Sequence, residues 1–128
     1  MSSISDSAVV DALRRQMTIA VAKQVASAGN LANVDTPGYK TKEVNFAETL
    51  KNTLSTKNST FPVAGGDAVK GSVVMQDAEG LPERRDGNNV QLDRELLSMS
   101  RASGDFAAAQ TALAAKFRLV RYAINEGR

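Results

Sequence analysis

The sequence predicts a mainly α-helical protein whose two long terminal helices pair as an antiparallel coiled coil. Two observations lead to this fold class. Apolar residues recur every three or four positions at both ends of the chain, which is the period of an amphipathic helix. The stretch between the ends is rich in glycine and proline and has no helical period. We therefore expect a short helix and an extended, irregular or β-like arm between the terminal helices.

Residues 1–33 are predicted to form the N-terminal helix of the coiled-coil domain. Asp6 and Ser7 are both suited to cap its start, because their side-chain oxygens can accept hydrogen bonds from the first free backbone N–H groups. The helix must end before Pro37, since the residue before a proline is kept out of the right-handed helical region. The apolar stripe that we assign to subunit assembly includes Leu13, Met17, Val21 and Val25.

Residues 90–128 are predicted to form the C-terminal helix of the same domain. From Leu92 to Ile124 the stripe positions advance by four and three residues without a break, as in a heptad repeat. At roughly 1.5 Å per residue such a helix is about 50 Å long, which is longer than a compact domain of this size needs. The positions expected to form the assembly interface are Leu96, Met99, Phe106, Leu113, Phe117 and Val120.

Two further segments lie between the helices. Residues 34–54 are predicted to contain a turn and a short helix, because Asn45 and Glu48 have the spacing of a capping box. Residues 55–89 are predicted to form an extended arm or linker, with β-like runs such as Val73-Val74-Met75. We expect neighbouring subunits to order this arm in the assembled state.

The end of the first helix carries a distinctive run, Asn30-Leu31-Ala32-Asn33-Val34-Asp35-Thr36-Pro37-Gly38-Tyr39-Lys40. Thr36-Pro37-Gly38-Tyr39 predicts a type II turn, in which Pro37 fixes φ near −65° and Gly38 supplies the positive φ that follows. Asn30 and Asn33 are placed to bond the free carbonyls of the helix end. The run has two interpretations: a helix stop with a tight turn, or a turn that aims the next segment at a neighbouring subunit.

A second run precedes the C-terminal helix and consists of Asp86, Gly87, Asn88, Asn89 and Val90. It predicts a turn that leads into the helix. A calcium loop is not expected, because the run lacks the Asp-x-Asn-x-Asp-Gly spacing and the later bidentate glutamate.

The composition argues against an enzyme and against a metal site. The chain has no cysteine and no histidine, which excludes a disulfide, a thiolate nucleophile, a zinc–thiolate site and the commonest general base. No cofactor is expected. A net charge of +2 and few aromatic residues give no nucleic-acid footprint. The first residues lack the basic and apolar regions of a cleaved signal, and no run approaches the ~20 apolar residues of a membrane span.

These motifs resemble the rod and hook family of bacterial flagellar axial proteins, over residues 17–50 and 84–125. The Asn-Leu-Ala-Asn helix end followed by Thr-Pro-Gly-Tyr is similar to the N-terminal motif of the family as a whole. The run from Asp86 to Glu95, and the run from Lys116 to Ile124, are similar to the C-terminal helix of a proximal rod protein. The resemblance implies a non-enzymatic subunit that assembles helically and transmits torque. Two sibling proximal rod proteins remain possible.

The resemblance also implies a location and partners. The subunit would lie in the rod of the basal body, spanning the periplasm, and would be exported by the flagellar type III apparatus without a cleaved signal. Its partners would be further copies of itself, other rod proteins, the membrane ring and the rod–ring adaptor protein, with no nucleic acid and no small-molecule substrate. The residues alone leave two other classes open: a soluble helical-hairpin adaptor for one partner, and a small carboxylate-dependent enzyme.

Overall fold

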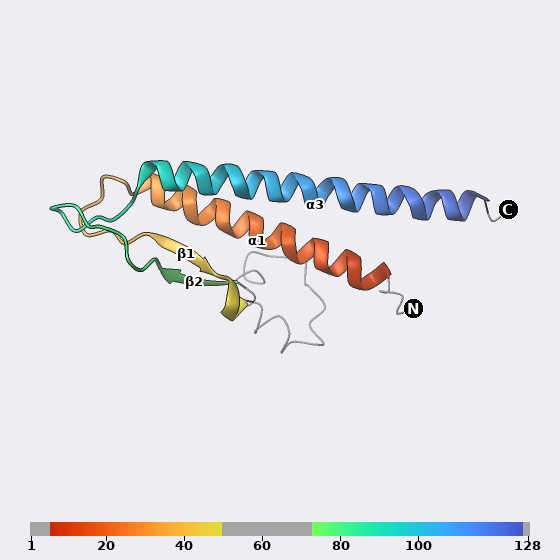
Figure 1. The fold of residues 1–128 in the computed structure, drawn as a ribbon, viewed down its shortest axis with the longest axis horizontal. Helices are drawn as coiled ribbons and strands as arrows, with labels where there is room; N and C mark the ends of the chain where they lie inside the picture. Colours follow the sequence, from red (N-terminus) through yellow and green to blue (C-terminus); the bar gives the residue numbers. More distant parts are fainter. Residues whose placement is uncertain (1–5, 50–72, 127–128) are drawn as a thin grey trace.

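The computed structural model describes residues 6–49 and 73–126. Helix α1 spans Asp6–Ala32 and helix α3 spans Leu92–Glu126. Between them lie strand β1 (Lys42–Asn45), a short helix that begins at residue 46, and strand β2 (Val74–Asp77). The mainly helical fold class is confirmed (Figure 1). The remainder of the expected short helix and the arm residues 55–72 lie outside the described residues.

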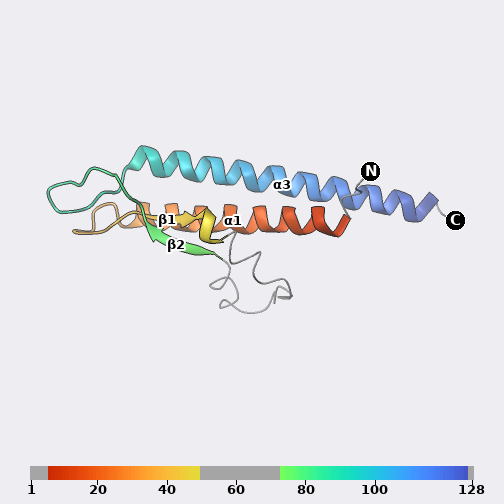
Figure 2. The same ribbon diagram turned by 60° about the horizontal axis from the view of Figure 1, so that its bottom comes forward.

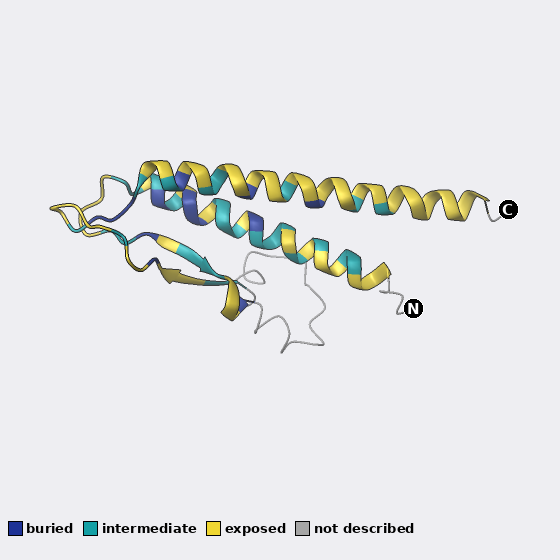
Figure 3. Ribbon diagram, viewed as in Figure 1, coloured by how far each residue is buried: buried dark blue, intermediate teal, exposed yellow. Residues whose placement is uncertain are grey.

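The two long helices lie side by side and run in opposite directions in both views (Figures 1 and 2). Their packing uses small side chains. The buried apolar residues of the described chain are five alanines and one valine: Ala20, Ala26, Ala78, Val90, Ala102 and Ala109. Because alanine adds little bulk to a helix surface, the two backbones can approach closely. Many of the larger apolar residues therefore remain exposed, and most of the others are half-buried (Figure 3).

The line of α3 that faces α1 can be traced from its contacts. Glu95 bonds Asn30 near one end of α1, and Lys116 pairs with Asp6 at the other end. These two residues lie 21 positions apart, and the buried Ala102 and Ala109 divide that interval into steps of seven. A second row at the same spacing, half-buried, consists of Met99, Phe106 and Leu113.

The predicted stripe of α3 is therefore shifted around the helix. It shares the row of Met99, Phe106 and Leu113 with the face that packs on α1, but its other members, Leu96 and Phe117 among them, are exposed. The second row of α3 that faces α1 consists of Glu95, Ala102 and Ala109 instead. The two possible second rows have the same heptad spacing, so periodicity alone could not select between them.

Strands β1 and β2 form a two-stranded antiparallel sheet beside α1, with Lys42 opposite Asp77 and Asn45 opposite Val74. The capping role predicted for Asn45 is confirmed, because its Oδ1 accepts a hydrogen bond from the backbone N–H of Glu48 at 3.0 Å. Strand β1 was not predicted, since its sequence Lys-Glu-Val-Asn contains a single apolar residue.

A helix must be both long and apolar to span a membrane. Neither α1 nor α3 combines the necessary length with sufficient apolar character.

Overpacking the helix interface should destabilise the fold. We expect Ala102→Leu, at a position only 1% exposed, to lower the free energy of unfolding by about 1–3 kcal/mol. Ala108→Leu, on the exposed side of the same helix, is the matched control and should change it by less than about 0.5 kcal/mol. Urea unfolding followed by circular dichroism in trimethylamine N-oxide, which favours burial, measures both values. Equal effects of the two substitutions would contradict this assignment of the interface.

Candidate assembly site

The turn after α1 has the predicted geometry. Gly38 has a φ of +74°, and the backbone N–H of Tyr39 donates to the carbonyl of Thr36 at 3.3 Å. These are the positive φ and the closing bond of a type II turn. Asn33 bonds the helix end as expected, because its Nδ2 donates to the carbonyl of Gly29 at 2.8 Å, although this carbonyl also accepts the backbone N–H of Asn33 at 3.2 Å.

Asn30 has a different role from the one expected. Its side chain is 0% exposed and turns away from the carbonyls of its own helix. Oδ1 accepts from the backbone N–H of Lys42 at 2.9 Å and from the Tyr39 hydroxyl at 3.1 Å. Nδ2 donates to the Lys42 carbonyl at 2.8 Å and to Glu95 Oε2 at 3.0 Å. One amide thus joins α1 to β1 and to α3.

The contact between Asn30 and Lys42 resembles a strand pairing. The side-chain oxygen of Asn30 accepts from the backbone N–H of Lys42, and its side-chain nitrogen donates to the backbone C=O of the same residue. A neighbouring strand would offer the same pair of groups. The outer edge of β1 is therefore closed at this residue by a side chain of α1, which fixes the position of the small sheet on the helix pair.

The run before α3 forms the expected turn, and it packs against the first turn. Gly87 has a φ of +83°, and its N–H donates to the carbonyl of Arg84 at 2.9 Å. The N–H of Gly38 donates to the carbonyl of Asp86 at 2.8 Å. A methyl group built on Gly87 would lie 3.5 Å from Cα of Gly38, so the two glycine backbones lie against each other.

Asn88 and Asn89 complete this junction. Nδ2 of Asn88 lies 2.9 Å from the carbonyl of Asn33, 3.1 Å from that of Val34 and 2.9 Å from that of Thr36. Its Oδ1 accepts from the N–H of Val90 at 2.8 Å, at the start of α3. A single side chain thereby holds the end of α1 against the beginning of α3.

Asn89 makes the matching contact with the segment that leads into β1. Its Oδ1 accepts from the backbone N–H and the hydroxyl of Thr41, at 2.7 and 2.9 Å. Both residues are buried. We name the asparagine hub as the set of buried polar residues at this junction: Asn30, Thr41, Asn88, Asn89 and Glu95.

Ion pairs surround the hub without entering it. Lys40 pairs with Glu83, and Lys42 pairs with Asp77 across the sheet. The hydrogen bond to Asp77 raises the pKa of the Lys42 ammonium above its ordinary value, so this group is charged at neutral pH. Because both side chains of the second pair are about half exposed, it should contribute little to stability.

The sequence-predicted interface residues are only partly brought together. Leu13, Met17, Met99, Phe106 and Leu113 are half-buried in the single chain. The remaining five are exposed, with exposed fractions between 42% and 63%: Val21, Val25, Leu96, Phe117 and Val120. Several large apolar residues that the prediction omitted are exposed as well: Phe46, Met75, Leu92, Leu97, Leu119, Tyr122 and Ile124.

The end of α3 extends past the first described residue of α1 (Figures 1 and 2). The ion pair between Lys116 and Asp6, at 2.5 Å, marks the point where α1 begins. Residues 117–126 continue beyond it for about 15 Å at the usual helical rise. This segment, the α3 overhang, carries exposed apolar side chains on more than one side, including Leu119 and Ile124 at 66% and 67% exposure.

No group of three or more acidic, cysteine or histidine side chains within residues 6–49 and 73–126 is arranged to hold a metal ion. The fold instead defines a class of elongated helical hairpins, in which amides hold the chain together and large apolar side chains lie on the surface.

The chain is similar to flagellar rod proteins of this kind. It is 25% identical to the flagellar basal body rod protein FlgB of Bacillus subtilis (strain 168) over 126 residues, which cover 95% of this chain and 97% of that protein. It is 25% identical to FlgB of Escherichia coli (strain K12), over 82% and 84% of the two chains. Identity to FlgB of Salmonella typhimurium is 31% over 57% of this chain and 61% of that one. No protein-family model matches the chain.

Removing a hub amide should be costly. We expect Asn88→Ala to lower the free energy of unfolding by about 1–3 kcal/mol, because the two N–H donors shared among three carbonyls and the acceptor for the N–H of Val90 are lost in a buried position. The control is Asn33→Ala, which removes a bond at the half-buried helix end and should cost about 1 kcal/mol or less. The same urea titration compares the two, and a larger effect at Asn33 would contradict the importance given to the hub.

Proposed function

We propose that this chain is a FlgB-type structural subunit of the proximal rod of the bacterial flagellum. The observation that carries the proposal is the similarity to FlgB along nearly the whole of both chains. The fold agrees with such a role, since a slender hairpin with exposed apolar rows is suited to packing among neighbours rather than to enclosing a substrate. The sibling proximal rod protein FlgC, which the sequence motifs left open, is less well supported because the relatives named above are all FlgB.

The mechanism that we infer is folding coupled to assembly. Within residues 6–49 and 73–126 the fully buried apolar residues are alanines and one valine, and the larger apolar side chains between the helices are only half-buried, so tertiary packing stabilises the helices modestly. Burying each large exposed side chain against a neighbour contributes about 1.5–3 kcal/mol. Several such contacts offset the ordering of the chain. Because one surface then meets a different surface of the next copy, repetition produces a helical tube rather than a closed ring.

The residues assigned to assembly divide between two regions. The exposed helix rows, with Val21 and Val25 on α1 and Leu96, Phe117 and Val120 on α3, would contact neighbouring helices. The half-buried residues of the predicted interface would support these rows from within the hairpin. Thr36, Pro37 and Gly38 remain exposed at the tip of the hairpin, where they are accessible to another subunit. The hub would keep these regions in a fixed relation, which transmission of torque requires.

The proposed setting is the basal-body rod, reached through the flagellar type III export apparatus. There the subunit would contact copies of itself, other rod proteins, the membrane ring and its adaptor protein. Deletion of the gene in a flagellated bacterium, followed by swimming assays and electron microscopy of basal bodies, tests this role. Normal flagella in the deletion strain would contradict it.

A soluble adaptor remains the rival function, and the free chain distinguishes the two. We expect the dilute monomer to be partly helical and to melt without a sharp transition, because so little apolar area is buried within it. Circular dichroism during heating measures this. Cooperative melting of a fully helical monomer would favour the adaptor.

A charge in the exposed row should block assembly without preventing export. We expect Phe117→Asp to abolish swimming, since the position is 51% exposed in the single chain and would be desolvated in the rod. Secretion of the variant into the medium should persist. The half-buried Leu113→Asp should have the same effect on swimming, with added strain on the hairpin.

The matched control introduces the same charge elsewhere on α3. Thr111→Asp replaces an exposed polar residue and should leave swimming intact. Full motility of the Phe117→Asp strain would remove Phe117 from the interface.

A further inference from the structure

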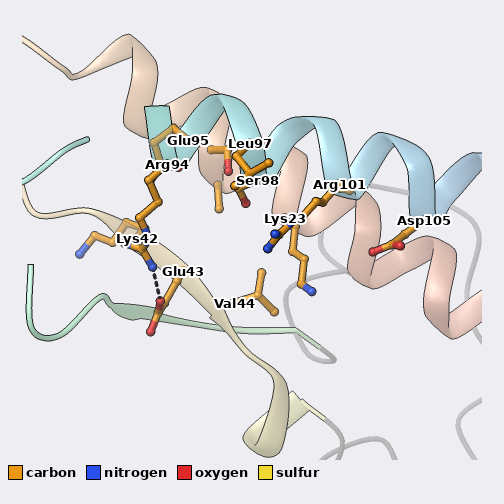
Figure 4. Close-up of a pocket in the computed structure, with 13 residues that line it drawn as sticks. Lys23, Lys42, Glu43, Val44, Arg94, Glu95, Leu97, Ser98, Arg101 and Asp105 are labelled. Atoms are coloured by element: carbon orange, nitrogen blue, oxygen red, sulfur yellow. Dashed lines mark hydrogen bonds and ion pairs between the residues drawn. The ribbon is translucent and has the colours of Figure 1, made fainter. Parts of the chain in front are cut away.

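A cleft of about 360 Å³ lies between β1 and the paired helices. Figure 4 shows residues of α1, β1 and α3 around it. At one end Arg94 reaches from α3 to β1, where its Nη2 donates to Glu43 Oε2 at 3.1 Å. Its other terminal nitrogen, Nη1, is buried without a hydrogen-bond partner in the described chain. Arg94 is thus a fixed tie that closes this end of the cleft.

Two other cations in the cleft have no anionic partner. Lys23 extends from α1 and Arg101 from α3, and Figure 4 shows both on the same side of the cleft as Val44. Neither makes a hydrogen bond or an ion pair within residues 6–49 and 73–126, although Asp105 also lines the cleft. The other acidic residues of the lining are already engaged, Glu43 by Arg94 and Glu95 by Asn30. Like charges at one site favour an added anion between them.

The cleft also has an apolar component. Its lining includes Ala26, Val44, Leu97 and Ala102. A free inorganic anion would leave this surface uncovered. A carboxylate that is carried on a helix beside apolar side chains would satisfy the cations and cover the apolar lining together. The matching chemistry is therefore that of an acidic, amphipathic segment of protein.

The chain itself exposes such a segment at the start of α3. Asp93 is exposed and has no ion pair among the described residues, and Leu96 follows it by three positions. Residues at this spacing are neighbours on a helix surface. Leu96 is more than half exposed and does not line the cleft. Asp93 and Leu96 thus form an acidic and apolar patch of the kind the cleft would accept.

The geometry points to a contact between copies: the cleft of one subunit receives Asp93, with Leu96, of a second copy of this chain. The contact rests on the proposed function, because it places the two copies next to each other in the rod. It joins different surfaces of the two molecules and can therefore repeat along an open helical assembly.

Engineered disulfides give a direct test, because the chain has no cysteine of its own. We would express the double variant Asp93→Cys, Arg101→Cys beside the wild-type chain and oxidise purified basal bodies. The two positions are eight residues apart on one helix, about 12 Å, which exceeds the ~7 Å limit for a disulfide within one chain. Disulfide-linked dimers and larger multimers are expected. Their absence from basal bodies that contain the variant would overturn the proposal.

The control pairs Asp93→Cys with Arg118→Cys, an exposed arginine of the α3 overhang outside the cleft, and should give no linked species. Equal linking in this control would also overturn the proposed contact.

Charge exchange provides a second measurement that needs no oxidation. Arg101→Glu and Asp93→Arg should each reduce the diameter of swimming halos at least several-fold, and the double variant should restore most of it. Unchanged swimming of Arg101→Glu, or no recovery in the double variant, would overturn the contact. Circular dichroism of the purified variants verifies that helix content is unchanged. Loss of flagella on deletion of the gene tests the proposed function separately, so failure of the contact leaves that result standing.

Discussion

The buried side-chain amide of Asn30 is the interaction on which the rest of the structure depends. It lies on α1, bonds the backbone of β1 through Lys42 and bonds α3 through Glu95. Since the fully buried apolar residues of the described part of the chain are no larger than valine, hydrophobic burial alone would fix the register of the helices weakly. A satisfied polar network has strict requirements for distance and direction. In this protein it supplies the register that large interlocking side chains provide elsewhere.

The small size of the buried apolar residues also determines the character of the surface. Alanines along the helix pair permit close approach, and many of the larger apolar residues of α1 and α3 are exposed (Figure 3). Within the single chain, amides and small residues maintain the shape, whereas leucine, valine and phenylalanine remain available to neighbours. Large exposed apolar areas are unusual in a monomeric protein and are typical of interaction surfaces. The distribution of residue sizes therefore supports an assembling subunit independently of any relative.

Local rules explain which features could be predicted from the sequence. The turn at Pro37 and the cap at Asn45 follow from neighbouring residues, and the antiparallel hairpin follows from two amphipathic ends. Three features depend on distant partners and were missed. Strand β1 exists because β2 and Asn30 bond both of its edges. Glu95 is buried only because Asn30, 65 residues earlier, meets it. The row of Glu95, Ala102 and Ala109 that packs on α1 could not be selected from the sequence, because neighbouring rows of α3 have the same period.

The hub also places strict demands on the residues that form it. The runs that carry the family resemblance, around Pro37 and around Gly87, are the ones that build the junction. Two glycines there adopt positive φ, and amide side chains use both their donor and acceptor atoms. Few other residues can meet these demands. The helix rows need only apolar character at the correct spacing, which many sequences satisfy. The physical demands on residue identity are thus stricter at the hub than along the exposed helix rows.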